Sequence, residues 1–272
     1  MTTPQLSVVI PAFNESVALD RNLPSITSYL ENHGISYEIV VSDDGSWDAT
    51  RRVAQAYTHR GVRVLGFDKN RGKGAALRSG VLASRGRQVL LADADFSMPI
   101  SDLPRLQNGL KYADLALGSR ATAQSQILRR QPWYRQLMGR VFRGVVRLAG
   151  VHGIRDTQCG FKLLRGDLAR ELFRDLTTKG FAFDVELIWL AQQRGYRVVE
   201  VGIRWADSEK TTVRPGIDSL FMLLEVVHFR WHGFRRRRER QDAELEAGPS
   251  PSSRSRTPGR KLATLTPTGA SN

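Results

Sequence analysis

Short β-rich runs alternate with helical patterns from Leu6 to Ser119, and no other feature of the sequence limits the possible folds as strongly. The β-rich runs are apolar along most of their length, which is typical of strands buried on both faces of a parallel sheet. The intervening segments repeat apolar residues at helical spacing, as Leu19, Leu23 and Ile26 do in the first of them. The pattern therefore predicts an α/β fold with a Rossmann-like, mostly parallel sheet and helices on both faces. The expected strands are Leu6–Pro11, Tyr37–Ser42, Val62–Phe67, Gln88–Ala92 and Ala113–Gly118, and the expected helices are Glu15–Asn32, Asp48–His59 and Lys73–Ser84.

Acidic residues stand where three of these strands end. Glu15 follows the first strand, Asp43 and Asp44 follow the second, and Asp93 and Asp95 follow the fourth. The carboxyl ends of parallel strands meet at one edge of the sheet, where ligands bind in folds of this kind. Taken singly, each cluster is also typical of a turn or a helix start. Together they predict a site for a hard cation such as Mg²⁺ or Mn²⁺, because converging carboxylates repel each other, and a metal-bridged diphosphate is the ligand that suits such a pair.

The net charge of +14 comes from 41 Lys and Arg against 27 Asp and Glu, and it indicates a nucleic acid or an anionic membrane surface as partner. The excess lies in two segments. Leu115–Arg155 contains eight arginines and no acid, and Arg235–Asn272 contributes +5. The remainder is close to neutral, so the charge belongs to two local surfaces. No apolar run reaches the roughly 20 residues of a membrane span, and with the single cysteine, Cys159, we expect a cytoplasmic protein.

Two basic segments have amphipathic helical patterns. In Trp133–Ala149, Leu137 and Val141 recur on one side, and Arg140 and Arg143 on the other. Such a helix is typical of a membrane interface. The second pattern, Ile217–Phe234, offers Leu220, Leu224, Val227 and Trp231 and leads into four consecutive arginines. Packing on the sheet is the alternative for both segments.

These patterns predict three parts of the chain. The α/β domain with the expected site spans 1–212, the second amphipathic helix spans 213–234, and a basic tail spans 235–272. Few apolar residues remain after Gly248, where Gly, Ser, Pro and Thr dominate, so we expect the tail to be disordered.

Seven further blocks of the sequence follow one another along the chain: Ser7–Glu15, Asp43–Asp48, Asn70–Gly74, Asp93–Asp95, Gly118–Arg120, Arg155–Lys162 and Ala182–Leu187. They resemble, in order, the motifs of the inverting family 2 glycosyltransferases of the GT-A fold, which transfer sugars from nucleotide diphosphates. The resemblance extends over Leu6–Phe234, and its later blocks are similar to the dolichyl-phosphate β-glucosyltransferase branch, next to the polyprenyl-phosphate mannosyltransferases. Two features differ: we expect no counterpart of the N-terminal transmembrane helix of the eukaryotic glucosyltransferases, and Ser97 stands where mannosyltransferases have a metal-binding Gln.

The resemblance implies roles on the donor side. Asp43 would contact the nucleobase, and Asp93 would lie near the ribose and the metal. Asp95 would bind Mg²⁺ or Mn²⁺ directly, and the metal would neutralise charge on the departing diphosphate. The other residues expected to bind the donor are Pro11, Phe13, Glu15, Arg71, Lys73 and Lys210.

The acceptor would be a polyprenyl monophosphate, which is mostly dianionic at pH 7 and can attack without a general base. Arg120, Arg129 and Arg130 can bind phosphate through bidentate hydrogen bonds. The position of Asp184 and Glu186 in the family implies that one of them faces the reaction centre. Both are also explained as favourable charges in the first turn of a helix.

We therefore expect transfer of a hexose, in the first instance glucose from UDP-glucose, to polyprenyl or dolichyl monophosphate. The enzyme would be peripheral on the cytoplasmic face of a membrane, and a membrane-anchoring partner protein is possible. A mannosyltransferase that uses GDP-mannose is the nearest alternative. Nucleic-acid binding is an alternative of another class, but the few aromatic residues near the arginines have helical spacing and do not resemble a base-stacking surface.

Overall fold

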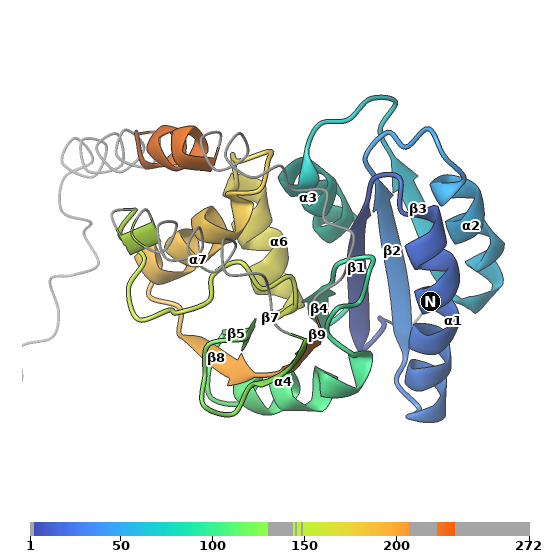
Figure 1. Cartoon of the computed structure of the whole chain (residues 1–272), viewed down its shortest axis with the longest axis horizontal. Helices are drawn as coiled ribbons and strands as arrows, with labels where there is room; N and C mark the ends of the chain where they lie inside the picture. Colours follow the sequence, from blue (N-terminus) through green and yellow to red (C-terminus); the bar gives the residue numbers. More distant parts are fainter. Residues whose placement is uncertain (1–2, 130–143, 145, 148, 207–221, 232–272) are drawn as a thin grey trace, which may run out of the picture. The chain divides into compact units, whose positions relative to one another are not determined.

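A computed structural model describes residues 3–129, 144, 146–147, 149–206 and 222–231. Met1–Arg230 form one compact unit, and only Trp231 is described in the second, Trp231–Asn272. The first unit contains a seven-stranded sheet in the order β3-β2-β1-β4-β7-β5-β8 with helices on both sides, as Figure 1 shows. This confirms the predicted α/β class.

The first four strands are parallel to one another, as the apolar runs predict. The crossovers between them contain helices, and α1 and α2 lie on the opposite side of the sheet from α3 (Figure 1). The elements are β1 (Leu6–Ala12), α1 (Ser16–Asn32), β2 (Tyr37–Asp43), α2 (Thr50–Ala56), β3 (Val62–Gly66), α3 (Lys73–Ala83) and β4 (Gln88–Leu91). The expected helix Asp48–His59 is shorter, because a 3₁₀ turn at Thr58–Arg60 follows α2 and Gly61, with φ of 73°, ends it.

The second half of the chain adds an antiparallel strand to this sheet. Strand β7 lies between β4 and β5 and runs antiparallel to both, while β5 and β8 are parallel. The elements are α4 (Leu103–Leu110), β5 (Leu115–Ser119), β7 (Lys162–Arg165), α6 (Gly166–Asp175), α7 (Phe183–Gln193) and β8 (Val198–Gly202). A separate pair, β6 (Gln126–Arg129) and β9 (Arg204–Ala206), is parallel.

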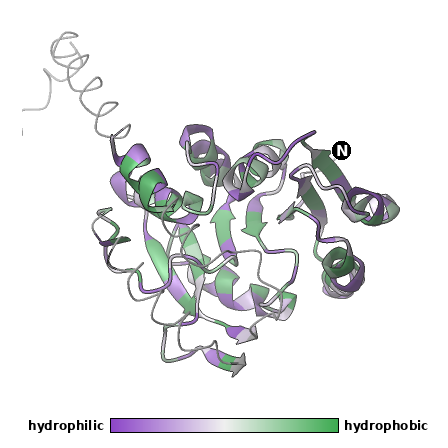
Figure 2. Cartoon of the chain, turned by 45° about the horizontal axis from the view of Figure 1, so that its top comes forward, coloured by the Kyte–Doolittle hydropathy of each residue, from purple (hydrophilic) through white to green (hydrophobic). Residues whose placement is uncertain are grey.

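Side chains alternate between two apolar cores along each buried strand. Val8 and Ile10 of β1 pack on the side of α1 and α4, whereas Val9 packs on the side of α3, α6 and α7. Most of the strand residues are accordingly hydrophobic in Figure 2, with single hydrophilic residues among them. Because both faces are covered, only the strand ends are left for polar side chains with a function.

The second amphipathic segment is described in part, and its role at a membrane interface stays a prediction. In the helical segment 222–231, Met222, Val226 and Phe229 are buried against the core that contains α7. Leu224 and Val227 are 56% and 60% exposed. One face thus packs on the domain and the other faces solvent. Among the described residues, no helix is long and apolar enough to cross a membrane.

Most of the first amphipathic segment lies outside the described residues. Of 133–149, only Gly144, Val146, Arg147 and Ala149 are described; Val146 and Ala149 are buried and Arg147 is exposed. The interface role of this helix stays a prediction, as does the disorder of 235–272.

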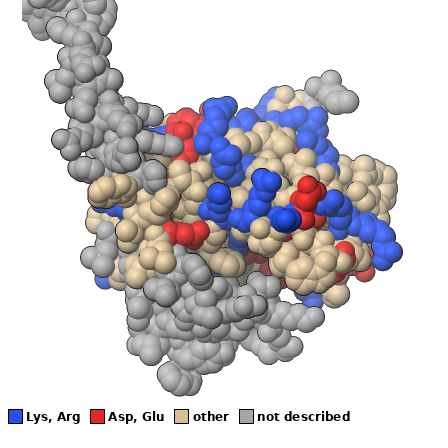
Figure 3. All heavy atoms as spheres, turned by 90° about the horizontal axis from the view of Figure 1, so that it is seen from above, with Lys and Arg blue, Asp and Glu red and all other residues tan. Residues whose placement is uncertain are grey.

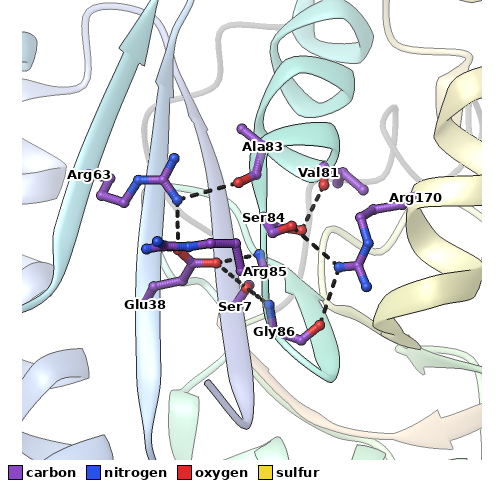
Figure 4. A network of polar contacts seen from close by, with 9 residues as sticks. All are labelled: Ser7, Glu38, Arg63, Val81, Ala83, Ser84, Arg85, Gly86 and Arg170. Atoms are coloured by element: carbon purple, nitrogen blue, oxygen red, sulfur yellow. Dashed lines mark hydrogen bonds and ion pairs between the residues drawn. The ribbon is translucent and has the colours of Figure 1, made fainter. Parts of the chain in front are cut away.

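A buried carboxylate near the start of β2 forms hydrogen bonds with neighbouring strands and with the loop after α3 (Figure 4). Glu38 is 3% exposed and accepts hydrogen bonds from Ser7 Oγ at 2.7 Å, Arg63 at 2.7 Å and the Arg85 backbone at 2.6 Å. Burial acts to raise the pKa of Glu38, but these donors outweigh it and hold the pKa below its usual value. The ionised carboxylate therefore links β1 and β2 to the loop after α3.

We predict that Glu38→Gln lowers the free energy of unfolding by about 2 kcal/mol at pH 7, because the donors lose an ionised acceptor. The lowered pKa means that the contribution is present above the unfolded pKa of about 4.3 and is lost as the pH falls through the folded value. Denaturant unfolding of both proteins between pH 7 and pH 3 measures this. Glu171→Gln, at a half-exposed ion pair with Arg194, is the control and costs less. A difference that stayed constant with pH would contradict the assignment.

Candidate functional site

The predicted acidic residues converge at the carboxyl edge of the sheet. Strands β1 and β4 are adjacent and parallel, with Val9 opposite Leu91, so that Glu15 comes near Asp93 and Asp95. The pKa of Glu15 is raised, first by burial and then by the charges of Asp95 and Asp93. Glu15 is therefore close enough to both aspartates for their negative charges to act on its carboxyl group, as the sequence predicts.

A lysine at the start of α3 neutralises one of these carboxylates. Lys73 Nζ lies 2.7 Å from Asp93 Oδ1. Burial acts to raise the pKa of Asp93, but the Lys73 ammonium outweighs it and holds this pKa below its usual value. The space around Asp93 is tight, because a Cβ on Gly160 would overlap the Asp93 carboxylate, with Cγ at 2.5 Å. Gly160 belongs to the 155–162 block, and its lack of a side chain lets β7 approach the site.

Asp95 has no cationic partner among the described ion pairs. Its oxygens accept hydrogen bonds from Ser97 N at 3.0 Å and Ser97 Oγ at 2.7 Å. Within the described ranges, no three His, Cys, Asp or Glu side chains are grouped so that they could hold a metal. Asp93 and Asp95 can still supply two oxygen ligands, and Mg²⁺ commonly takes one or two carboxylates together with substrate phosphates. The donor set thus fits a hard cation that shares its coordination with a diphosphate.

A second ion pair lies behind the first. Asp184, in the first turn of α7, contacts the ammonium of Lys162, which is fully buried in β7 and also donates to the Cys159 carbonyl. Burial raises the pKa of Asp184, although Lys162 and Lys73 act to lower it. The interaction of Asp184 with both Lys73 and Asp93 shows that the two pairs form one cluster of alternating charge.

The structure distinguishes Asp184 from Glu186. The Glu186 carboxylate accepts hydrogen bonds from Thr177 N and Oγ1 and from Thr178 N, at 2.7–3.1 Å. It therefore holds the loop before α7, whereas Asp184 belongs to the charged cluster.

Arg120 is held by a carboxylate that sequence reasoning did not assign. Its Nε and Nη2 donate to the two oxygens of Asp156, each at 2.7 Å, and its guanidinium lies 5.4 Å from the Trp205 ring centre. The Glu200 carboxylate in turn binds the backbone N–H groups of Arg155 and Asp156. Asp156 thus fixes the orientation of Arg120, and only the remaining N–H groups of the guanidinium can bind a ligand.

The predicted nucleobase residues occupy the loops after β1 and β2. Phe13 contacts Trp47 edge to face, with ring centres 5.0 Å apart, and Trp47 is 79% exposed. Pro11 is a half-buried residue of β1. The Asp43 carboxylate is fully buried and binds Arg51 at 2.9 Å and Ser46 N at 3.2 Å. Contact of Asp43 with a base stays a prediction.

Asp44 has a role that the sequence analysis missed. Its two oxygens accept hydrogen bonds from the backbone N–H groups of Arg71 and Gly72, at 2.8 and 2.9 Å. It thereby fixes the loop that leads to Lys73, and the Arg71 guanidinium lies 4.6 Å from the Phe67 ring centre. The Asp-Asp pair was a visible signal, but nothing in the sequence indicated which loop it would bind.

The remaining predicted residues are only partly described. Arg129 ends β6, and its side chain is outside the described set. Arg130 and Lys210 also lie outside the described residues.

Basic residues are widespread on the face seen in Figure 3, where Lys and Arg cover more of the described surface than Asp and Glu do. Near Arg120 there is a cleft of about 370 Å³ with both apolar and cationic walls. Its lining residues are Ala121, Val146, Arg147, Ile154, Arg155 and Thr157. An apolar chain that carries a phosphate has the properties that such walls accept.

The sequence matches known proteins over most of its length. The model of glycosyl transferase family 2 matches residues 7–173. Dolichyl-phosphate beta-glucosyltransferase of Homo sapiens is 37% identical over 252 residues, covering 84% of this chain and 78% of that protein. The protein of the same name from Drosophila melanogaster is 38% identical, covering 78% and 70%, and that of Saccharomyces cerevisiae is 32% identical, covering 83% and 74%.

Solved structures confirm the fold. Glucosyl-3-phosphoglycerate synthase of Mycobacterium tuberculosis, in complex with Mn²⁺, UDP-glucose and phosphoglyceric acid, aligns with a TM-score of 0.62 and 20% identity, covering 84% of this chain and 80% of that one. Mannosyl-3-phosphoglycerate synthase of Rubrobacter xylanophilus aligns with a TM-score of 0.60 and 18% identity, covering 95% and 79%. The chain therefore belongs to glycosyl transferase family 2 and is a hexosyltransferase with the GT-A fold.

Proposed function

We propose that this chain transfers glucose from UDP-glucose to a polyprenyl monophosphate of the dolichyl type. The observation that carries the proposal is the meeting of Asp93, Asp95 and Lys73 at the carboxyl edge of the sheet. Carboxylates for a metal and an ammonium beside them suit a nucleoside diphosphate donor. The sugar and the acceptor are taken from the names of the relatives that are 32–38% identical.

Asp93 and Asp95 would hold a divalent cation, Mg²⁺ or Mn²⁺. When bound, the cation would stabilise the negative charge that develops on the departing diphosphate. Solved neighbours of the same fold bind Mn²⁺ together with UDP, which supports this donor set. Lys73 and Arg71 would bind the donor from the loop that Asp44 fixes, and Phe13 with Trp47 would flank the base.

The acceptor needs orientation more than deprotonation. A polyprenyl phosphate is mostly dianionic at pH 7, so its oxygen can attack the anomeric carbon without a protein base. Asp184 is consistent with this, because its carboxylate is buried against Lys162 instead of facing solvent. Arg120, held by Asp156, would orient a phosphate with its remaining donors, and the adjacent apolar and basic cleft would accept the lipid end.

The enzyme would act at a membrane surface. A polyprenyl acceptor remains in the bilayer, so the site has to approach the interface. Leu223, Leu224 and Val227 are exposed on one helical segment and supply an apolar surface. The basic segment 133–149 would add attraction to anionic lipids, with about 1 kcal/mol for each Arg near the surface. The cytoplasmic face and an anchoring partner protein stay predictions.

A comparison of two sugar donors tests the proposed reaction directly. The purified chain is incubated with polyprenyl phosphate, Mn²⁺ and either UDP-glucose or GDP-mannose, and the lipid product is identified by mass spectrometry. We expect a glucosylated lipid phosphate as the product and a rate with GDP-mannose that is at least about 100-fold lower. A site that hydrogen-bonds one nucleobase discriminates against another base, because polar groups of the site are then left without partners. Faster transfer from GDP-mannose would overturn the choice of donor, and no transfer from any nucleotide sugar would overturn the proposal.

Asp95→Asn tests the metal site. We expect transfer to fall at least 100-fold and Mn²⁺ binding in the presence of UDP to weaken at least 10-fold, because the change removes one of two anionic ligands. Calorimetric titration with Mn²⁺ measures the binding independently of turnover. Asp20→Asn, at an exposed position on α1, is the matched control and leaves both values unchanged. Unaltered Mn²⁺ binding by Asp95→Asn would contradict the assignment.

A charge on the exposed helix face tests membrane binding. We expect the double variant Leu224→Glu and Val227→Glu to bind anionic vesicles at least 10-fold more weakly, because each exposed apolar side chain contributes about 1.5–3 kcal/mol when buried. Co-sedimentation with vesicles that contain phosphatidylserine measures the partition. Val17→Glu, at a 73% exposed position on α1, is the matched control. Equal loss in both variants would indicate a general charge effect and contradict this surface.

A further inference from the structure

The loop that leads into α7 is bound by a carboxylate from a distant part of the chain. The helix begins at Phe183, and its N-cap residue is Ala182, which has no side chain that can accept a hydrogen bond. Just before the helix, Glu225 Oε1 accepts a hydrogen bond from Gly180 N at 2.7 Å and Glu225 Oε2 accepts one from Ala182 N at 3.1 Å. Glu225 is half-buried and comes from the helical segment 222–231. A carboxylate at the N-terminus of a helix binds otherwise unpaired N–H groups and interacts favourably with the helix dipole.

The Glu225 carboxylate lies close against the backbone of Gly180. A Cβ on Gly180 would lie 2.5 Å from Glu225 Oε1 and 2.8 Å from Oε2. The φ angle of Gly180 is not in the left-handed region. A side chain at this position would therefore displace the Glu225 carboxylate without straining the backbone.

The same loop is packed against the residues on both sides of Lys73. Ala75 N donates to the Lys179 carbonyl at 3.1 Å. A Cβ on Gly72 would overlap that carbonyl oxygen, and a Cβ on Gly74 would lie 2.5 Å from the Thr178 oxygen. A displacement of the loop therefore reaches the start of α3, whose first residue, Lys73, pairs with Asp93 at 2.7 Å.

The loop also leads directly to Asp184, two residues after Ala182. On its other side, Glu186 binds the backbone of Thr177 and Thr178. Two carboxylates from separate helices thus hold residues 177–182, and both ion pairs of the site depend on where this loop lies.

We propose that Glu225 is a positioning residue: through residues 177–182 it sets the positions of Lys73 and Asp184 in the charged site. Its hydrogen bonds in the described part of the chain go to the backbone of this loop. The role of Glu225 can be tested without substrates, and only the activity measurements depend on the proposed function.

Amide hydrogen exchange tests the structural part without substrates. In Glu225→Gln one carboxylate oxygen is replaced by an NH₂ group, which cannot accept a hydrogen bond. We expect exchange to become at least 10-fold faster at whichever of Gly180 and Ala182 loses its acceptor, and exchange at Ala75, on α3, to become several-fold faster. Glu171→Gln is the matched control, because it removes a carboxylate on α6 that pairs with Arg194. Unchanged protection of the Ala75 amide in Glu225→Gln would overturn the proposal.

Kinetics test whether the position matters for turnover. We expect Glu225→Gln to lower kcat about 10-fold at a temperature well below its Tm, with a smaller effect on the KM of the donor, since small displacements of oriented groups reduce rates strongly. A change in Tm with an unaltered kcat would show a purely structural role and overturn the proposal.

A double-mutant cycle identifies the contact itself. Gly180→Ala places a Cβ against the carboxylate and should lower kcat to a similar extent, but it should add little in a Glu225→Ala background, where the space is free. Additive effects would contradict a shared contact. If the unaltered chain transfers no sugar, the proposed function fails, while the exchange experiment still decides the role of Glu225.

Discussion

The architecture of the site follows from one electrostatic constraint: carboxylates at the ends of adjacent parallel strands have to be balanced by nearby positive charge. The register of β1 and β4 brings Glu15 towards Asp93 and Asp95, because these residues follow the carboxyl ends of two adjacent strands. Lys73 provides the balance within the protein from the start of α3. Lys162 provides a second cation from β7, where it would be a costly buried charge without Asp184. Asp95 has no cationic partner in the part of the chain that the structure describes, and a divalent cation would compensate its charge.

The parts of this arrangement that follow from local pattern could be predicted from the sequence. The first four strands have apolar runs that fit a buried parallel sheet, and the carboxyl edge of such a sheet is fixed once the strands are assigned. The convergence of Asp93 and Asp95 with Glu15 therefore did not require the structure. The helix starts were less predictable: α2 begins at Thr50, and the Asp48 carboxylate also accepts a hydrogen bond from Ser16 N, 32 residues earlier in the chain.

Long-range partners could not be predicted, because no periodicity encodes them. The antiparallel insertion of β7 between β4 and β5 decides that Lys162 lies under the site. The pairing of Arg120 with Asp156 gives that arginine a structural partner as well as an expected ligand. Asp184 and Glu186 are two residues apart in one helical turn, and only their partners separate a member of the charged cluster from a residue that holds a loop.

An enzyme with a lipid acceptor needs an apolar outer surface and a fixed arrangement of its charged site. The helical segment 222–231 contributes to both. Its inner face buries Met222, Val226 and Phe229, and the Phe229 ring lies 5.6 Å from that of Trp189 in α7. Burial of three such side chains is worth about 5 kcal/mol, so the segment stays attached to α7 whether or not its outer apolar face is covered. The attachment keeps the Glu225 carboxylate at the start of α7, beside the loop that precedes Asp184. The same apolar packing thus orients the exposed apolar face that we propose to contact a membrane, and it holds Glu225 at the loop that leads to the charged site.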